Sequence, residues 1–505
     1  DANGVASYSW AKISGSGTVT FTPDSTSANP TFVANADDSY VVRVTVTDNA
    51  GNTNTADVNF TWDTTNPVVS LTTPDSAGIL LRGGQSYNIT WSAIDTNMSG
   101  NSILLEYSSN NGSSWNTITT TNNDGTHPWT VPSINTSQAL VRITATDDAG
   151  NDALDTSSNN FIIDSTPPAI TVTTPDLGVI NSAIAAGVSA TDANGIASYS
   201  WSKISGSGAV TFTPSSANAN PTFSANADDS YVVRVTVTDN AGNTNTADVS
   251  FTWDTTDPVV TVLTPSASGL VLNNSSSYEI TWSATDANIS ADSISIDYSN
   301  NNGSSWSAVD HAINSGSYPW TTPATNNSES LIRITATDEA GNTGFDQSDY
   351  TFSIDADAPG VAVDPIIGTI NDNTPTVTGG VLDLVNVVSA EYKVDDGSWL
   401  ACSAEDGNFD EPIENFICTV SPALSDGSHT IYVRATDAFG HTSDGTQSTG
   451  SFIVDTTLPI VTSATASPDP AKDGSVTITV VFDKAMNTAI DPSVTITGLT
   501  GSYTA

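Results

Sequence analysis

The sequence has little positive charge. It carries 11 Lys and Arg against 55 Asp and Glu, so the formal net charge is −44, although only 13% of the residues are charged. A nucleic-acid-binding surface needs Lys and Arg to neutralise phosphates, and anionic lipid surfaces attract the same residues. The composition therefore excludes nucleic acid as a partner and makes attachment to an anionic membrane surface unfavourable.

Cysteine, histidine and long apolar runs are also scarce. The 505 residues include two Cys and four His, and no apolar run reaches the 18 residues that a membrane-spanning helix needs. The HExxH, GxSxG and phosphate-binding glycine motifs are missing. We therefore expect no enzyme active site and no direct membrane insertion in this segment.

The chain has enough apolar residues to form buried cores. Hydrophobic residues make up 37% of it and include 11 Trp, a composition that argues against intrinsic disorder. The length predicts about three to five domains.

An internal repeat sets the domain organisation. Residues 1–10 recur with one difference as residues 192–201, and the motif D-x-x-x-P recurs at Asp63, Asp164, Asp254, Asp355 and Asp455. Proline cannot donate to a strand ladder, so each motif indicates a linker. The predicted domains are 1–64 (lacking its N-terminal part), 65–164, 165–255, 256–355, 356–455 (with a disulfide loop) and 456–505 (lacking its C-terminal part).

Each predicted domain has the pattern of an all-β fold. Tyr40, Val42, Val44 and Val46 alternate with the residues between them, as in a half-buried strand, and residues 140–146, 231–238, 331–337 and 431–436 repeat the pattern. Several short strands in 90–100 residues predict Ig-like sandwiches, with Tyr40 and Tyr231 placed to form tyrosine corners. In tandem these sandwiches would form an extended rod.

Several motifs resemble known families. Residues 199–208 (YSWSKISGSG), 210–212, 219–223 and 231–239 resemble a PKD-type domain, which implies an Ig-like, fibronectin-III-like sandwich of a surface protein. The T-D-x-A-G-N turns and D-T-T-x-P linkers resemble bacterial Ig-like repeats of large calcium-dependent surface adhesins. Residues 481–486 (VFDKAM) resemble another bacterial Ig-like type. These resemblances imply fold and an extracellular setting, and they identify no ligand.

Acidic residues recur where consecutive sandwiches should meet. In an Ig-type sandwich the entering chain, the B–C loop and the F–G loop share one end, so their carboxylates should gather there. Ca²⁺ takes six to eight oxygen ligands and suits such a cluster, and the adhesin resemblance implies the same ion. The predicted ligands are Asp63, Asp95, Asp147, Asp148, Asp164, Asp192, Asp239, Asp254, Asp257, Asp286, Asp338, Glu339, Asp355, Asp357 and Asp437. The alternative is that these residues only form turns.

Three further residue sets have structural and functional interpretations. Arg43, Arg142, Arg234, Arg333 and Arg434 recur on the same predicted strand, which favours cross-strand ion pairs over a binding role. The tryptophans could stack on sugars, but Trp91 lies in an alternating strand, which favours core packing. Cys402 and Cys418 predict a disulfide formed in an oxidising compartment, with two free thiols as the alternative.

These observations predict an extracellular structural stalk of a large repetitive cell-surface protein of the adhesin class, which projects a distal module. Its expected partners are the neighbouring domains of the same chain. A first alternative is a filament or surface-layer subunit that assembles with identical chains. Others are the accessory region of a secreted hydrolase and direct ligand binding by the Trp-bearing domains.

Overall fold

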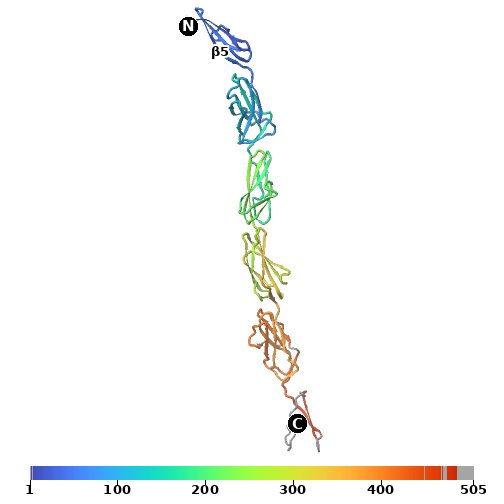
Figure 1. The fold of residues 1–505 in the computed structure, drawn as a ribbon. Coiled ribbons are helices and arrows are strands. Elements are labelled where there is room, and N and C mark those ends of the chain that lie inside the picture. The colour runs from blue at the N-terminus through green and yellow to red at the C-terminus, as the bar shows by residue number, and fades with distance from the viewer. Residues whose placement is uncertain (1, 3, 448–449, 468, 470–474, 486–505) are drawn as a thin grey trace. The chain divides into compact units, whose positions relative to one another are not determined.

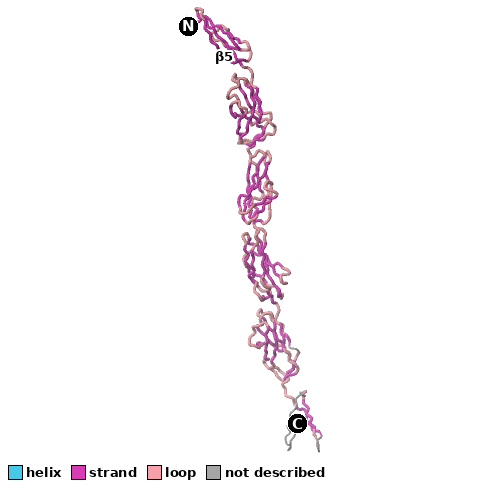
Figure 2. Tube along the Cα trace, in the orientation of Figure 1, coloured by secondary structure: helices cyan, strands magenta, loops and turns pink. Residues whose placement is uncertain are grey.

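The computed structural model describes residues 2, 4–447, 450–467, 469 and 475–485. Within these residues the chain is built from strands and loops, without a helix (Figure 2). No described segment forms a helix that could cross a bilayer. Contacts divide the chain into two compact units, Asp1–Thr256 with Glu339–Gly341, and Asp257–Asp338 with Asn342–Ala505, and each unit is described by itself.

The first unit begins with a sheet of order β1-β4-β5 and a separate hairpin β2-β3, drawn in blue in Figure 1 with β5 labelled. The rings of Trp10 and Phe32 (centroids 5.3 Å apart) and of Phe32 and Phe60 (5.7 Å) pack between them. The strands are β1 (Val5–Ser14), β2 (Val19–Thr22), β3 (Thr31–Ala34), β4 (Asp38–Asp48) and β5 (Thr53–Trp62).

A two-sheet sandwich follows. One sheet has the order β11-β8-β6, and the other has the order β10-β9-β12-β14-β7 with β13 paired to β12. Ile89 and Trp91 of the first sheet and Leu105 and Val141 of the second share one buried core. The strands are β6 (Val68–Thr73), β7 (Leu80–Arg82), β8 (Ser86–Ile94), β9 (Ile103–Ser108), β10 (Asn116–Thr121), β11 (Thr126–Thr130), β12 (Thr136–Thr146), β13 (Asp152–Thr156) and β14 (Phe161–Asp164).

The last part of the first unit repeats the arrangement at its beginning. Its main sheet has the order β16-β22-β21-β18, and β15-β17 and β19-β20 form two pairs. Trp201, Phe223, Tyr231 and Phe251 lie in its core. The strands are β15 (Ala169–Val172), β16 (Asp176–Ile180), β17 (Val188–Thr191), β18 (Ile196–Ser205), β19 (Val210–Thr213), β20 (Thr222–Ala225), β21 (Asp229–Asp239) and β22 (Thr244–Trp253).

The second unit begins with the same sandwich topology as β6–β14. Its sheets are β23-β25-β28 and β24-β31-β29-β26-β27, with β30 paired to β29. The strands are β23 (Val259–Thr264), β24 (Val271–Asn273), β25 (Ser277–Thr285), β26 (Ile289–Ser299), β27 (Ser307–Ala312), β28 (Ser317–Thr321), β29 (Asn327–Asp338), β30 (Thr343–Gln347) and β31 (Phe352–Asp355).

The remaining strands form the sheets β32-β34-β38-β37, β33-β42-β39 and β36-β35-β40-β41, followed by the pair β43-β44. They are β32 (Gly360–Val363), β33 (Thr369–Ile370), β34 (Thr376–Leu382), β35 (Val387–Val394), β36 (Leu400–Ala401), β37 (Ser403–Ala404), β38 (Ile413–Thr419), β39 (Gly427–His429), β40 (Ile431–Asp437), β41 (Thr446–Gln447), β42 (Phe452–Val454), β43 (Val461–Ser467) and β44 (Thr477–Phe482). Residues 486–505 of the proposed last domain, including Met486 of the VFDKAM motif, lie outside the described residues.

The period-two alternation places the cores as predicted. Tyr231, Val233, Val235 and Val237 of β21 are at most 1% exposed, while the residues between them face outward. Tyr231 Oη donates to the Ala227 carbonyl (2.7 Å) and accepts from the Gly208 amide (3.0 Å). Tyr40 makes the equivalent bonds, so both predicted tyrosine corners are confirmed.

Gly206 shows why the S-G-S-G segment is needed. Its φ is +108°, and a Cβ there would lie 2.2 Å from Tyr231 Cδ1. Only glycine avoids both the steric contact and the backbone strain. The all-β tandem-sandwich fold class is thus confirmed, while the division into six domains at the D-x-x-x-P motifs stays a prediction.

Candidate metal centres

Three predicted carboxylates meet in the first unit at the end of β5. Asp63 follows β5, Asp95 follows β8 and Asp147 follows β12. One oxygen of each lies within 4.8 Å of the others, and Asp147 is buried. In the described part of the chain, none of the three has a Lys, Arg or His partner within 4.0 Å. Three carboxylates at this spacing repel one another unless a cation lies between them.

A second group repeats this arrangement. Asp164, Asp192 and Asp239 also offer one oxygen each within 4.8 Å. Asp164 is 3% exposed and Asp239 is 1% exposed, so two charges of this group lie almost wholly out of water. Burial of uncompensated charge costs free energy, which makes this the more demanding of the two groups.

Turn hydrogen bonds hold the carboxylates in place. Asp147 Oδ1 accepts from the amides of Ala149 and Asn151, and its Oδ2 accepts from Asn151 Nδ2 (2.8 Å). Asp95 Oδ1 accepts from the Asn97 amide (2.8 Å), and Asn97 Nδ2 donates to Asp63 Oδ2. The turn-forming interpretation therefore holds for these residues. It does not exclude a cation, because an ionised carboxylate has about four acceptor sites.

The pKa of Asp147 fits an ionised group. Burial by itself would raise it, but the hydrogen bonds from Asn151, Ala149 and Gly150 outweigh burial and lower the pKa below its usual value. The carboxylate is therefore charged at neutral pH, as a cation ligand must be.

Asparagine side chains tie each linker to the sandwich that follows it. Asn151 Nδ2 donates to the Asp63 carbonyl (3.2 Å), and Asn243 Nδ2 donates to the Asp164 carbonyl (3.2 Å). Arg82 Nε, from the preceding sandwich, donates to Asn243 Oδ1 (3.1 Å). Polar contacts thus join consecutive sandwiches at the second group.

The linkers are also anchored to the sandwich before them. Asp37 accepts from the Thr64 amide (2.9 Å) and from Thr65 Oγ1 (2.6 Å), and Asp228 makes the same bonds with Thr255 and Thr256. At the linker after β14, Asn135 bonds Ser165 and Thr166 instead. Sequence reasoning missed these anchors, although each lies 26–29 residues before its linker Asp.

The other predicted ligands divide into separate environments. Asp254 belongs to the first unit, whereas Asp286 and Asp338 belong to the second, so their convergence stays a prediction. Asp148 accepts a hydrogen bond from Ser99 Oγ, and Asp357 accepts one from Asn326 Nδ2. Asp148, Asp357, Asp257 and Glu339 are not among the grouped carboxylates of the described residues.

The fourth group, inside the second unit, has a different composition. Asp355 and Asp437 meet as predicted, and the third member is His441. Burial, together with the charges of Asp383 and Asp437, raises the pKa of Asp355. Sequence reasoning missed Asp383 and His441. Their signals were Asp383 at the B–C position and His441 in the place that Asn151 and Asn243 hold in the other groups.

The recurrent arginines have a structural role. Arg43, Arg142 and Arg234 pair with Asp57, Glu106 and Asp248 on the neighbouring strand at 2.5–2.6 Å. Arg333–Asp297 and Arg434–Glu391 complete the series, and all five pairs are direct cross-strand partners. Arg142 and Arg333 also lie 4.4 Å from the ring centroids of Trp115 and Trp306. The predicted cross-strand ion pairs are confirmed.

The tryptophans of the alternating strands are core residues. Trp91, Trp129, Trp201, Trp282 and Trp320 are 3–5% exposed. Their rings therefore have no open face on which a sugar could stack.

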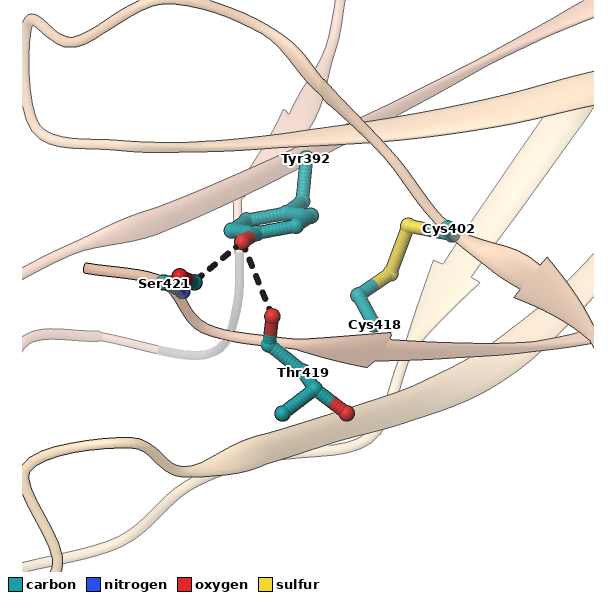
Figure 3. Close-up of a disulfide and its surroundings, with 5 residues drawn as sticks. All are labelled: Tyr392, Cys402, Cys418, Thr419 and Ser421. Atoms are coloured by element: carbon teal, nitrogen blue, oxygen red, sulfur yellow. Dashed lines mark hydrogen bonds between the residues drawn. A yellow bond between two sulfur atoms is a disulfide. The ribbon is translucent and has the colours of Figure 1, made fainter. Parts of the chain in front are cut away.

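Cys402 and Cys418 are joined by a disulfide with Cα atoms 4.4 Å apart (Figure 3). Ser403 pairs with Ile417 in the β37–β38 ladder, so the two cysteines continue the antiparallel register. Beside them Tyr392 Oη donates to the Thr419 carbonyl (2.9 Å) and accepts from the Ser421 amide (3.0 Å) (Figure 3). In the acidic loop, Glu414 accepts from the amides of Asp410 and Glu411.

His429 is expected to make part of the stability pH-dependent. Its Nδ1 lies 2.8 Å from Asp395 Oδ2 and its Nε2 lies 2.8 Å from the Ser425 carbonyl. The bonds to Asp395 and Ser425 raise its pKa above 6.5. Its stabilising contribution is therefore complete below pH about 6.5 and is lost as pH rises through the folded-state pKa. We expect the melting-temperature difference between wild type and His429→Gln to be larger at pH 5.5 than at pH 8.5. An equal difference at both values would contradict the assignment, and exposed His311→Gln serves as the control.

Comparisons with known proteins agree with this architecture. A family model for the PKD domain matches residues 1–61 and 170–252. Comparison with curated proteins gave no match. Among solved structures, one described as a Ca²⁺-stabilised adhesin that helps an Antarctic bacterium reach out and bind ice is 20% identical (78% of this chain and 100% of that chain covered, TM-score 0.32).

Two further similar structures are a tetra-tandem repeat in the extending region of a large adhesion protein and a set of titin domains. The first is 18% identical (78% and 100% covered, TM-score 0.26), and the second is 13% identical (57% and 97% covered, TM-score 0.27). Because these TM-scores are below 0.5, the fold assignment rests on the strand pairing described above. The chain therefore contains two PKD domains among its tandem Ig-like sandwiches.

Proposed function

We propose that this chain is an extracellular structural stalk of an adhesion-related surface protein, in which tandem sandwiches form an extended rod and calcium stiffens the junctions. The observation that carries the proposal is the recurrence of three-carboxylate groups where one sandwich leads into the next. A stalk must resist bending at its junctions, because the sandwiches themselves are rigid and the linkers between them are short.

The residues present suit calcium. Carboxylates, Asn side chains and backbone carbonyls are its preferred ligands, and all three types occur at each group in the first unit. Asp63, Asp95 and Asp147 would hold one ion, and Asp164, Asp192 and Asp239 another. Calcium, when bound, would neutralise the carboxylates and join the linker to the loops of the following sandwich. The linker anchors Asp37 and Asn135 extend that connection to the preceding sandwich.

The disulfide supports the extracellular setting. Disulfides persist in oxidising environments such as the cell exterior, and Cys402–Cys418 closes a 16-residue separation on neighbouring strands. The large negative charge also suits a projecting stalk, because like-charged chains repel one another and resist strand-edge pairing.

Small-angle scattering of the full chain tests the proposal. We expect calcium to increase the maximum dimension and narrow the conformational distribution, because bridged carboxylates restrict bending at the linkers. The double variant Asp95→Asn/Asp192→Asn should lose most of the response. The control Asp292→Asn removes one charge at an exposed position outside the groups and should respond as wild type does. Superimposable wild-type curves in calcium and chelator would overturn the proposal.

A further inference from the structure

The group at Asp355, Asp437 and His441 differs chemically from the groups of the first unit. His441 occupies the position of Asn151 and Asn243, four residues after the Asp that ends the preceding strand. In those groups the Asn amide Nδ2 donates to that Asp. At the fourth group His441 Nδ1 lies 2.8 Å from Asp437 Oδ2 and 3.9 Å from Asp355 Oδ2. An imidazole nitrogen therefore faces both carboxylates.

A buried oxygen at this group lacks a partner. Asp355 is 1% exposed, and its Oδ2 accepts no hydrogen bond within the described residues. In the first unit the linker Asp is satisfied by the B–C loop Asn, since Asn97 donates to Asp63 and Asn194 donates to Asp164. The B–C loop of the fourth group has Asp383-Leu384-Val385, so an apolar side chain replaces that Asn.

A second unsatisfied acceptor lies beside the first. Asn273 Oδ1 is buried without a hydrogen-bond partner among the described residues, and Asn273 is the direct neighbour of Asp355 in the parallel pair β24–β31. At the equivalent position the first unit has Arg82, beside Asp164. The fourth group therefore lacks both the amide donor and the guanidinium found at the second group.

We propose that Asp355, Asp437 and His441 bind a divalent transition-metal ion of the zinc type. Imidazole with carboxylate suits Zn²⁺, whereas Ca²⁺ takes oxygen ligands. Ligand atoms around a tetrahedral zinc lie roughly 3.4 Å apart at bond lengths near 2.1 Å. The observed separations of 2.8 and 3.9 Å from His441 Nδ1 lie on either side of that value.

The second ring nitrogen supports this role. His441 Nε2 lies 3.2 Å from Asn274 Oδ1, so Nε2 can carry the proton and donate it to that amide oxygen. This leaves Nδ1 with a lone pair for the metal. Metal-ligating histidines commonly donate their other ring N–H to an oxygen in this way. The inference rests on the proposed function insofar as junction carboxylates bind cations, and it assigns a different ion to this group.

Titration of Zn²⁺ into the full chain held in excess calcium tests the inference. We expect one tight zinc site in wild type, weakened about 100-fold by His441→Asn, which restores the residue of the other groups. His311→Asn removes an exposed histidine and should leave the tight site intact. Co²⁺ substitution should give visible absorption bands that His441→Asn abolishes, and Zn²⁺ should shift the ¹⁵N resonance of His441 Nδ1.

The outcomes separate this inference from the proposed function. Equal zinc affinity in wild type and His441→Asn, or no tight zinc site in wild type, would overturn it. His441 would then serve as an imidazolium counter-ion for the two aspartates. Tight zinc binding without a calcium effect on scattering would contradict only the proposed function.

Discussion

Saturating calcium is expected to raise the melting temperature of the sandwiches that follow Asp63 and Asp164 by about 10–20 °C. A ligand that binds only the folded state at a hundredfold excess over its Kd adds about 2.7 kcal/mol to the free energy of unfolding. For a sandwich of this size, each kcal/mol shifts the melting temperature by about 4–8 °C. Calorimetry of the full chain in calcium and in chelator measures the shift.

The variant Asp192→Asn makes this test specific, because calcium should reverse its effect. Asn retains the side-chain oxygen that accepts from the Asn194 amide, so the turn should persist. In chelator the variant is expected to match or slightly exceed wild type, since one repelling charge is gone. In calcium it should be less stable than wild type by about 1–3 kcal/mol. A variant that is equally destabilised in both conditions would show that Asp192 only forms the turn.

Removal of the disulfide is expected to lower the free energy of unfolding of the sandwich at 356–455 by about 3 kcal/mol, because the crosslink restricts the unfolded chain. The double variant Cys402→Ala/Cys418→Ala should lower the melting temperature of that sandwich by roughly 10–20 °C. Cys418 is fully buried, so loss of its sulfur adds to the effect. Amide exchange should accelerate in β40, whose residues Ile431 and Val433 share the same core.

Exchange in β21 provides the internal control for the disulfide prediction. β21 lies in the other unit and in a different core, so its protection should not change. A reductant applied to wild type should reproduce the effect of the double variant. Unchanged exchange in β40 after reduction would mean that the core of Val377, Tyr392 and Phe416 alone sustains this sandwich.

The fold class, the repeat and the core-forming strands could all be predicted from the amino-acid order. This was possible because strand period and turn chemistry are local: Val233, Val235 and Val237 alternate with outward-facing residues, and glycine is needed next to Tyr231 whatever the rest of the chain does. The arginine ion pairs followed from the same regularity. Asp63, Asp95 and Asp147 could be grouped in advance because Ig-type topology brings the linker and two loops to one end.

Which acids share a group, and what accompanies them, became clear only in the folded chain. Asp148 and Asp357 stand beside predicted ligands in the sequence but bond to Ser99 and Asn326 instead, because adjacent residues at a turn point in different directions. His441 joined Asp355 across 86 positions, and Asp37 fastened a linker that begins 26 residues later. Residue order thus shows where charge accumulates along the chain. Packing sets which charges lie close enough to need a shared cation, since Coulomb energy depends on distances in space.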